Sequence, residues 1–191
     1  MKKSFRSKTL VGLVLAFILT VGSIVFFNGS VLAQMSEHTH GADGTGHDEV
    51  IMPGLRGTNA SPEESAELAV MFRNFETISR EVTVLPNGIR TVTRSSDEDV
   101  MAELISHVTG MINRVEEGDD PEIIIQSRTL DILFARGDRI QTEIEVTDTG
   151  IVVIQTSDDT EVVEALHVHA AEVSDMADRG MQAVHEMMMR N

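Results

Sequence analysis

The chain repeats itself once, and this internal repeat constrains the fold more than any other feature of the sequence. Residues 65–118 and 127–180 align without a gap at a fixed offset of 62 residues, and 14 of the 54 aligned pairs are identical. The identical pairs include one histidine near the end of each copy, His107 and His169. Because a period of this length occurs only twice, we predict two similar halves packed about a pseudo-two-fold axis rather than a solenoid.

Each copy carries the pattern helix, β-hairpin, helix. In the first copy, Ser61-Pro62 followed by acidic residues is typical of a helix start. Pro86-Asn87-Gly88 separates two segments rich in β-branched residues, which predicts a hairpin with a tight Asn-Gly turn. A second helix is expected from Val100 to Glu117, ending at Gly118. We therefore predict an α+β fold in which internally duplicated helix–hairpin–helix units build a four-stranded antiparallel sheet with helices packed on it.

The second copy follows the same plan with different residues. Asp120-Pro121-Glu122 again has an acidic cap followed by proline, which predicts a helix start. Residues 139–146 and 151–155 are expected to form the second hairpin. A single long helix is then expected from Asp158 or Asp159 to Met189.

The N-terminal segment has the pattern of a signal peptide. Four of the first eight residues are basic, residues 10–27 are almost entirely apolar, and Ala33 ends a sequence suited to signal peptidase. We predict that residues 1–33 are removed and that the protein is exported to the periplasm or the extracellular space. Because the apolar run is close to the ~20 residues that span a bilayer, the alternative is an uncleaved membrane anchor.

The remaining chain divides into a leader and a domain. Residues 34–60 are rich in Gly, Ser, Thr, Asp and His and show no helical or strand period, which predicts a flexible leader. Residues 61–191 are expected to form the duplicated domain.

Charge and composition exclude several classes of function. The chain has 15 basic and 31 acidic residues, and removal of residues 1–33 takes away four basic ones, leaving a net charge near −20. Such a surface repels nucleic acid and anionic lipid, so we expect neither as a partner, and no membrane contact beyond the N-terminal segment. The absence of cysteine excludes thiolate metal sites and cysteine nucleophiles.

The sequence also argues against an enzyme. It contains no nucleophile elbow, phosphate loop, zinc-protease motif or dinucleotide fingerprint. Its acidic residues stand at expected helix caps and turns, where capping and solvation explain them. General acid–base catalysis needs a carboxylate in an apolar cleft, and no acidic residue stands within an apolar run.

The paired histidines are the best candidates for a binding site. At 100° per residue, His107 and His169 fall on the apolar faces of their helices and are expected to point inward. Met111 and Met176 lie near them, and imidazole with thioether suits copper or a non-covalently held haem iron. We therefore predict a metal- or haem-binding protein. The alternative is that both histidines are structural, each hydrogen-bonded to backbone or carboxylate, and that no cofactor binds.

Other histidines and methionines offer weaker sites. Auxiliary metal ligands are predicted in the leader and at the C-terminus: His38, His40, His47, Met181 and His185. His167 falls on the outer face of the last helix and is expected on the surface. The second hypothesis for function is a cofactor-free protein-interaction module, as a homodimer or with another protein, which uses the acidic surface or the methionine-rich C-terminal helix.

Overall fold

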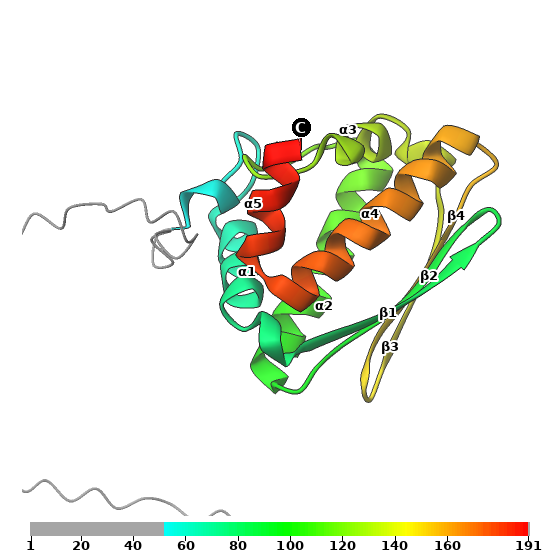
Figure 1. Cartoon of the computed structure of the whole chain (residues 1–191). Helices are drawn as coiled ribbons and strands as arrows, with labels where there is room; N and C mark the ends of the chain where they lie inside the picture. The colour runs from blue at the N-terminus through cyan, green and yellow to red at the C-terminus, as the bar shows by residue number, and fades with distance from the viewer. Residues whose placement is uncertain (1–51, 191) are drawn as a thin grey trace, which may run out of the picture. The chain divides into compact units, whose positions relative to one another are not determined.

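The structure, a computed structural model, describes residues 52–190 (Figure 1). The predicted signal peptide and the leader histidines His38, His40 and His47 lie outside the described residues. Predictions for these segments therefore stay predictions.

One four-stranded antiparallel sheet forms the floor of the domain. Its strands are β1 (Ile78–Leu85), β2 (Gly88–Ser95), β3 (Gln141–Thr147) and β4 (Gly150–Thr156). They stand in the order β1-β2-β4-β3, so the two hairpins join through their second strands. Val92 pairs with Val152 at this junction.

The helices pack on one side of this sheet. They are α1 (Pro62–Arg73), α2 (Glu98–Glu117), α3 (Arg128–Ala135), α4 (Thr160–Arg179) and α5 (Met181–Arg190), with short 3-10 turns η1 (Pro53–Leu55), η2 (Phe75–Thr77) and η3 (Gly137–Arg139). Figure 1 shows the sheet with its helices on a single face, and the outer face carries exposed polar side chains such as Glu81 and Thr83. The predicted α+β architecture is confirmed. Within residues 52–190, no helix has the length and apolar character needed to cross a membrane.

Local sequence signals explain most helix ends. Ser61 forms a capping box with Glu64 at the start of α1. The Asp97 carboxylate accepts hydrogen bonds from the backbone N–H groups of Asp99 and Val100 at the start of α2. Gly118 ends α2 with φ 66°, a left-handed conformation that favours glycine.

The predicted helix start at Asp120-Pro121-Glu122 is wrong. Helix α3 begins only at Arg128, and Ile123 forms an antiparallel bridge with Gly57. The Ile124 N–H donates to the Arg56 carbonyl at 2.9 Å, and a turn follows in which the Gln126 N–H donates to the Ile123 carbonyl at 2.9 Å. Isoleucine has a low preference for helix compared with strand, and the backbone hydrogen bonds to residues 54–57 outweigh the cap signal at Asp120.

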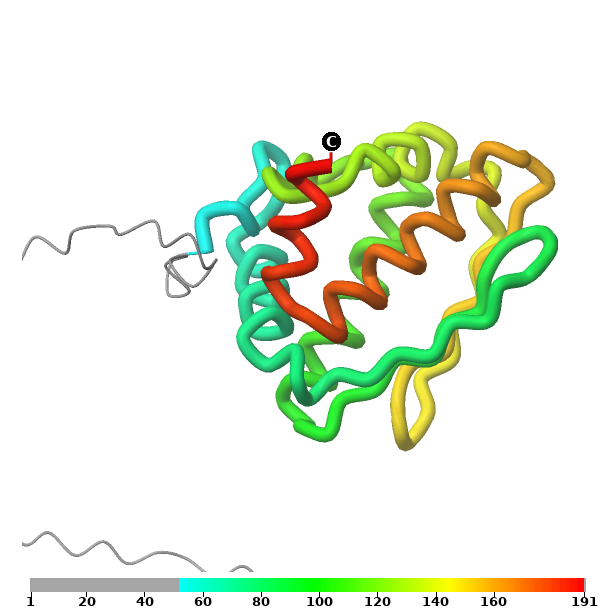
Figure 2. The backbone as a smooth tube through the Cα atoms, in the orientation of Figure 1, coloured from blue at the N-terminus to red at the C-terminus, as the bar shows by residue number. Residues whose placement is uncertain are grey.

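The long C-terminal helix is also interrupted. Gly180 (φ 57°, ψ −138°) separates α4 from α5, and the chain turns back at this residue (Figure 2). A Cβ at Gly180 would lie 2.8 Å from Cδ1 of Phe75, so both the conformation and the contact require glycine. The single helix predicted up to Met189 is therefore two helices, α4 and α5, which meet at Gly180.

Order begins before Ser61, in the segment expected to belong to the flexible leader. Met52 and Leu55 are buried against α1. Arg114 of α2 adds polar contacts, with hydrogen bonds to the Asn59 carbonyl and to the Glu64 carboxylate. The composition of residues 52–60 resembles a loop, but its two apolar side chains complete a small core.

The turn of the first hairpin is centred one residue earlier than the predicted Asn-Gly turn. Leu85 pairs with Gly88, so Pro86 and Asn87 are the central residues and Gly88 already belongs to β2. A Cβ at Gly88 would lie 1.9 Å from the Gln155 carbonyl oxygen. Glycine is needed here because β2 approaches β4 closely.

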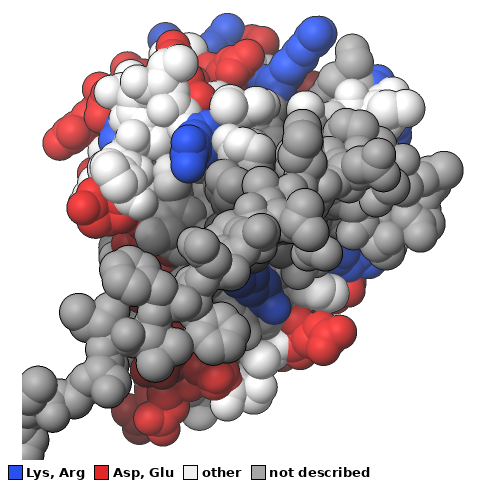
Figure 3. Space-filling view, turned by 90° about the vertical axis from the view of Figure 1, so that its left-hand side faces the viewer, with Lys and Arg blue, Asp and Glu red and all other residues white. Residues whose placement is uncertain are grey.

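Acidic side chains form groups on the surface. On the face shown in Figure 3, they gather towards the upper left and the lower edge, with basic side chains standing singly between them. This distribution agrees with the acidic composition of the chain.

Candidate functional site

A cavity of about 300 Å³ lies between the sheet and helices α1 to α4. Strands β1, β2 and β4 form its floor, and most of its walls are apolar side chains. Its volume stands at the lower end of the roughly 300–1,000 Å³ that small-molecule sites occupy. In a single domain, where internal voids are usually no larger than a few water molecules, this space is large.

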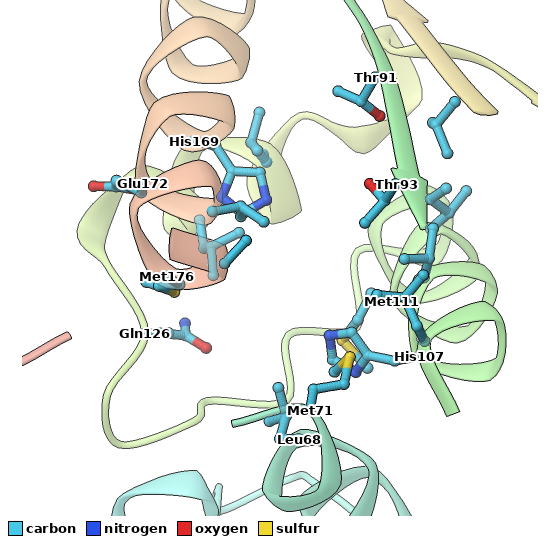
Figure 4. Close-up of a pocket in the computed structure, with 18 of the residues that line it drawn as sticks. Leu68, Met71, Thr91, Thr93, His107, Met111, Gln126, His169, Glu172 and Met176 are labelled. Carbon is cyan, nitrogen blue, oxygen red and sulfur yellow. The ribbon is translucent and has the colours of Figure 1, made fainter. Parts of the chain in front are cut away.

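All four predicted principal ligands line this cavity. His107 and Met111 project from α2, and His169 and Met176 from α4 (Figure 4). The prediction that both histidines face the interior is confirmed. Metal or haem binding by these four residues remains a prediction.

His169 is held neutral by its surroundings. Burial lowers its pKa to about 4, and the nearby positive charges of Arg80 and, to a smaller extent, His107 act in the same direction. At neutral pH the imidazole is therefore uncharged. In Figure 4 it lies across the cavity from Thr91 and Thr93 of β2.

His107 has a different environment. Its Nδ1 atom lies 3.7 Å from Oε2 of Glu67 on α1, which is too long for a hydrogen bond and makes the contact electrostatic. Nδ1 is buried and has no hydrogen-bond partner within the described part of the chain. The neighbouring imidazole, and with it the Ser106 hydroxyl that donates at 2.5 Å, lowers the pKa of the Glu67 carboxyl against the opposing effect of burial.

Arg80 brings a positive charge into the cavity, and no acidic side chain among residues 52–190 pairs with it. Its side chain points from β1 toward the helices and lines the cavity. One guanidinium nitrogen, Nη1, donates to Thr93 Oγ1 at 2.9 Å, whereas Nε is buried and has no hydrogen-bond partner among residues 52–190. Burial alone lowers the pKa of Arg80 to about 10, and no acidic side chain counteracts it. The group nevertheless stays charged at neutral pH.

The other polar groups at the cavity already have partners. The Glu172 carboxylate accepts a hydrogen bond from the Ser127 hydroxyl at 2.7 Å, and in Figure 4 its side chain leaves α4 on the side away from Thr91 and Thr93. The Gln126 side-chain amide donates to Asp120. The buried side-chain atoms that lack a hydrogen-bond partner among residues 52–190 are Nε of Arg80 and Nδ1 of His107.

Several of these residues were not predicted as site residues. Met71 of α1 places a further thioether beside Met111 and His107 (Figure 4). Arg80 could have been found from its pattern, since it occupies an inward position of β1 between Ile78 and Val82. A charged residue within an apolar alternation is a signal that the sequence contains.

The expected surface position of His167 is wrong. Its Nε2 lies 3.1 Å from the Leu85 carbonyl oxygen and 2.9 Å from that of Gly88. The ring nitrogen donates to this pair of carbonyls and so joins α4 to the β1–β2 turn. Helical periodicity correctly placed His167 outside the main apolar face of α4. The β1–β2 hairpin lies against that position and leaves His167 only partly exposed.

Of the predicted auxiliary ligands, Met181 and His185 fall within the described residues, and metal binding by them stays a prediction. His185 is exposed on α5 and Met181 is half-buried one turn before it. Residues 52–190 contain no group of three or more His, Cys, Asp or Glu side chains placed to hold a metal ion. Any metal site here would therefore need thioether sulfur.

Comparison with known proteins adds no homologue. The chain matches no family model, no curated protein and no solved structure.

Proposed function

We propose that this chain is an exported, non-enzymatic binding protein that holds a small, largely apolar ligand in the cavity between its sheet and helices. The cavity itself carries the proposal. Its apolar walls lack packing partners across this space, and an apolar occupant would supply them.

The lining fits the usual composition of a ligand site. Such sites combine apolar walls with a few convergent polar groups that orient the ligand. Here the polar groups include Arg80, His107, His169, Thr91 and Thr93. Export follows from the N-terminal pattern, and an uncleaved anchor is the alternative.

Ligand uptake can be tested with a neutral fluorescent probe such as N-phenyl-1-naphthylamine. We expect its emission to rise on binding to the wild-type protein. Thr91→Phe, which places a ring in the cavity, should weaken binding at least tenfold. Thr83→Phe is the matched control, because Thr83 is exposed on the outer face of β1. No binding to the wild type, or equal binding to Thr91→Phe, would contradict the proposal.

A second candidate is the predicted soft-metal site. It is supported by the shared exposure of His107, His169, Met111 and Met176 to one cavity, and by the Glu67 carboxylate beside His107, an arrangement common behind metal-bound imidazoles. The cavity volume favours a single copper ion over haem, which is a much larger group. The charge of Arg80 opposes any cation, which places this candidate second.

Copper binding is measured by competition with a chromophoric Cu(I) chelator. If the metal hypothesis holds, the wild type retains a single Cu(I) ion, and the double variant His107→Leu/His169→Leu loses it. His185→Gln serves as the control, because His185 lies outside the cavity on α5. Copper retention by the double variant would dispose of the site.

We also propose that the domain arose by tandem duplication with a pseudo-two-fold arrangement. The support is that element bounds recur at the sequence offset of 62 residues. Helix α2 spans 98–117 and α4 spans 160–179, while β2 and β4 begin at Gly88 and Gly150. The strand order, with the second strand of each hairpin at the centre, agrees with this proposal.

The protein-interaction hypothesis rests on exposed apolar side chains. Met188 and Met189 at the end of α5 are 48% and 77% exposed, and Val84 and Val146 are exposed where the hairpins extend beyond the helices. Sedimentation analysis of the wild type would reveal a homodimer. If the wild type is a monomer, the homodimer is excluded, and the interaction hypothesis then requires a different protein as the partner.

A further inference from the structure

We infer that the ligand of the cavity carries a carboxylate, which pairs with the guanidinium of Arg80 while an apolar body fills the remaining space. This inference rests on the proposed function and adds to it the chemical class of the ligand. The observation behind it is a half-buried guanidinium at a largely apolar cavity, with no acidic partner among residues 52–190 and a buried Nε that makes no hydrogen bond there.

A charge in this position is costly unless a partner compensates it. Moving an ion out of water without a counterion costs several kcal/mol, and buried charges in proteins are therefore paired. Arginine carries five N–H donors, of which the structure shows one in use, from Nη1 to Thr93. The remaining donors are arranged as a planar fork, which matches a carboxylate.

The groups around Arg80 suit the same anion. The Thr93 hydroxyl accepts from Arg80, so its own proton is available to a second acceptor. Thr91 is buried two residues earlier on the same face of β2. His169, whose imidazole is neutral, offers an N–H donor from the opposite wall. An acid thus finds several donors and one full positive charge.

Other ligand classes fit less well. A metal cation would be repelled by Arg80. A phosphate carries up to two negative charges, whereas the cavity lining has a single arginine and also contains the acidic side chain of Glu172. A neutral apolar molecule would leave the positive charge of Arg80 uncompensated. A monocarboxylic acid with a hydrocarbon body satisfies both the charge and the walls.

The test compares two probes that differ in the head group alone. Decanoate and decanol have the same chain length, and their binding to the full protein is measured at pH 7 by isothermal titration calorimetry. The variants are Arg80→Met, which removes the charge but keeps an unbranched side chain, and Arg80→Lys, which keeps the charge but loses the fork. Arg90→Met is the matched control, because Arg90 is exposed on the outer face of β2.

We expect the wild type and Arg90→Met to prefer decanoate by roughly ten- to a hundred-fold, the range of a charge-assisted hydrogen-bonded pair. Arg80→Met should bind both probes alike, and Arg80→Lys should keep a reduced preference. Arg80→Met is expected to fold, since replacing a buried unpaired charge by an apolar side chain is neutral or stabilising. Thermal unfolding without ligand checks this point.

Two outcomes separate the inference from the proposal beneath it. If decanol binds as tightly as decanoate, or if Arg80→Met keeps the preference, the carboxylate inference is overturned and the cavity remains a ligand site. If neither decanoate, decanol nor the neutral fluorescent probe binds, the ligand-binding function fails and the inference fails with it.

Discussion

His107 and His169 occupy equivalent positions in α2 and α4, yet their surroundings differ in charge. His107 lies 3.7 Å from the Glu67 carboxylate, whereas His169 faces the guanidinium of Arg80 and is kept neutral by burial. The position equivalent to Arg80 in the second copy is Thr142, so no second arginine balances the arrangement. His107 therefore has a carboxylate neighbour, whereas the guanidinium near His169 has no acidic partner among residues 52–190.

This difference shows how two similar helices can serve one asymmetric site. A symmetric cavity with two equal histidines would suit a metal ion bound between them. The carboxylate beside His107 and the guanidinium near His169 make the two sides of the cavity different in charge. A ligand with one charged head and an apolar body would bind in a single orientation.

The largest expected effect concerns core packing around α2 and α4, which differs between the side of the cavity and the side away from it. Leu166 of α4 is fully buried away from the cavity, while its equivalent Leu104 of α2 lines it. We expect Leu166→Ala to lower the free energy of unfolding by about 3–5 kcal/mol and Leu104→Ala by about 2–3 kcal/mol, because the space beside Leu104 already lacks contacts. Urea unfolding measures both. Equal losses would contradict the packing difference.

The second prediction concerns the pH dependence of stability. The folded-state pKa of His169, about 4, lies below its usual value of 6.5, so the unfolded state takes up the proton first as the pH falls. Stability is therefore complete above pH 6.5 and decreases toward pH 4, by about 3 kcal/mol in total. His169→Leu should remove this dependence, and His107→Leu should retain it. Chemical unfolding at pH 7, 6 and 5 distinguishes them.

A smaller effect is expected at Glu67, beside His107. Glu67→Gln removes the charge beside His107 and weakens the contact with Ser106, at a cost of about 1 kcal/mol at pH 7. Because the pKa of Glu67 is lowered in the folded state, its contribution is present above pH 4.5 and is lost as the pH falls through its folded value. The difference between variant and wild type should thus shrink at pH 3. An unchanged difference there would show that the charge is irrelevant.

The smallest expected difference lies at the caps of the two helices. Asp97 caps α2 by hydrogen bonds alone, whereas Asp159 caps α4 and also pairs with Arg136 at 2.9 Å. Asp159→Ala should therefore lower the melting temperature slightly more than Asp97→Ala. In 1 M NaCl the ion pair is screened and the two variants should become alike. If the difference between the two variants persists in 1 M NaCl, it comes from the cap hydrogen bonds and not from the ion pair with Arg136.

Much of the fold could be predicted from local signals. The hairpins, the caps at Ser61 and Asp97 and the end of α2 at Gly118 follow from short patterns whose physical causes are local. The failures occur where distant segments meet. Residues 123–125 pair with the segment around Gly57 instead of forming a helix, and Phe75 helps to set the break at Gly180.

The candidate site shows the same division. Helical periodicity placed His107 and His169 in the interior, and that placement is correct. It could not show that His167 binds the β1–β2 turn, because the turn comes from a segment about 80 residues away. The inward position of Arg80 could be read from the alternation of β1, but the lack of an acidic partner among residues 52–190 could not.

Residue periodicity was enough to predict the two hairpins, the helix that follows each of them, and the inward direction of His107 and His169. What surrounds these histidines depends on packing between elements: a carboxylate lies beside His107, a guanidinium lies near His169, and both line one cavity. The physical reason is that periodicity depends on neighbours within one element and tells which side of it is buried. The partners of a buried charge come from other elements, and their identity depends on how the whole chain packs.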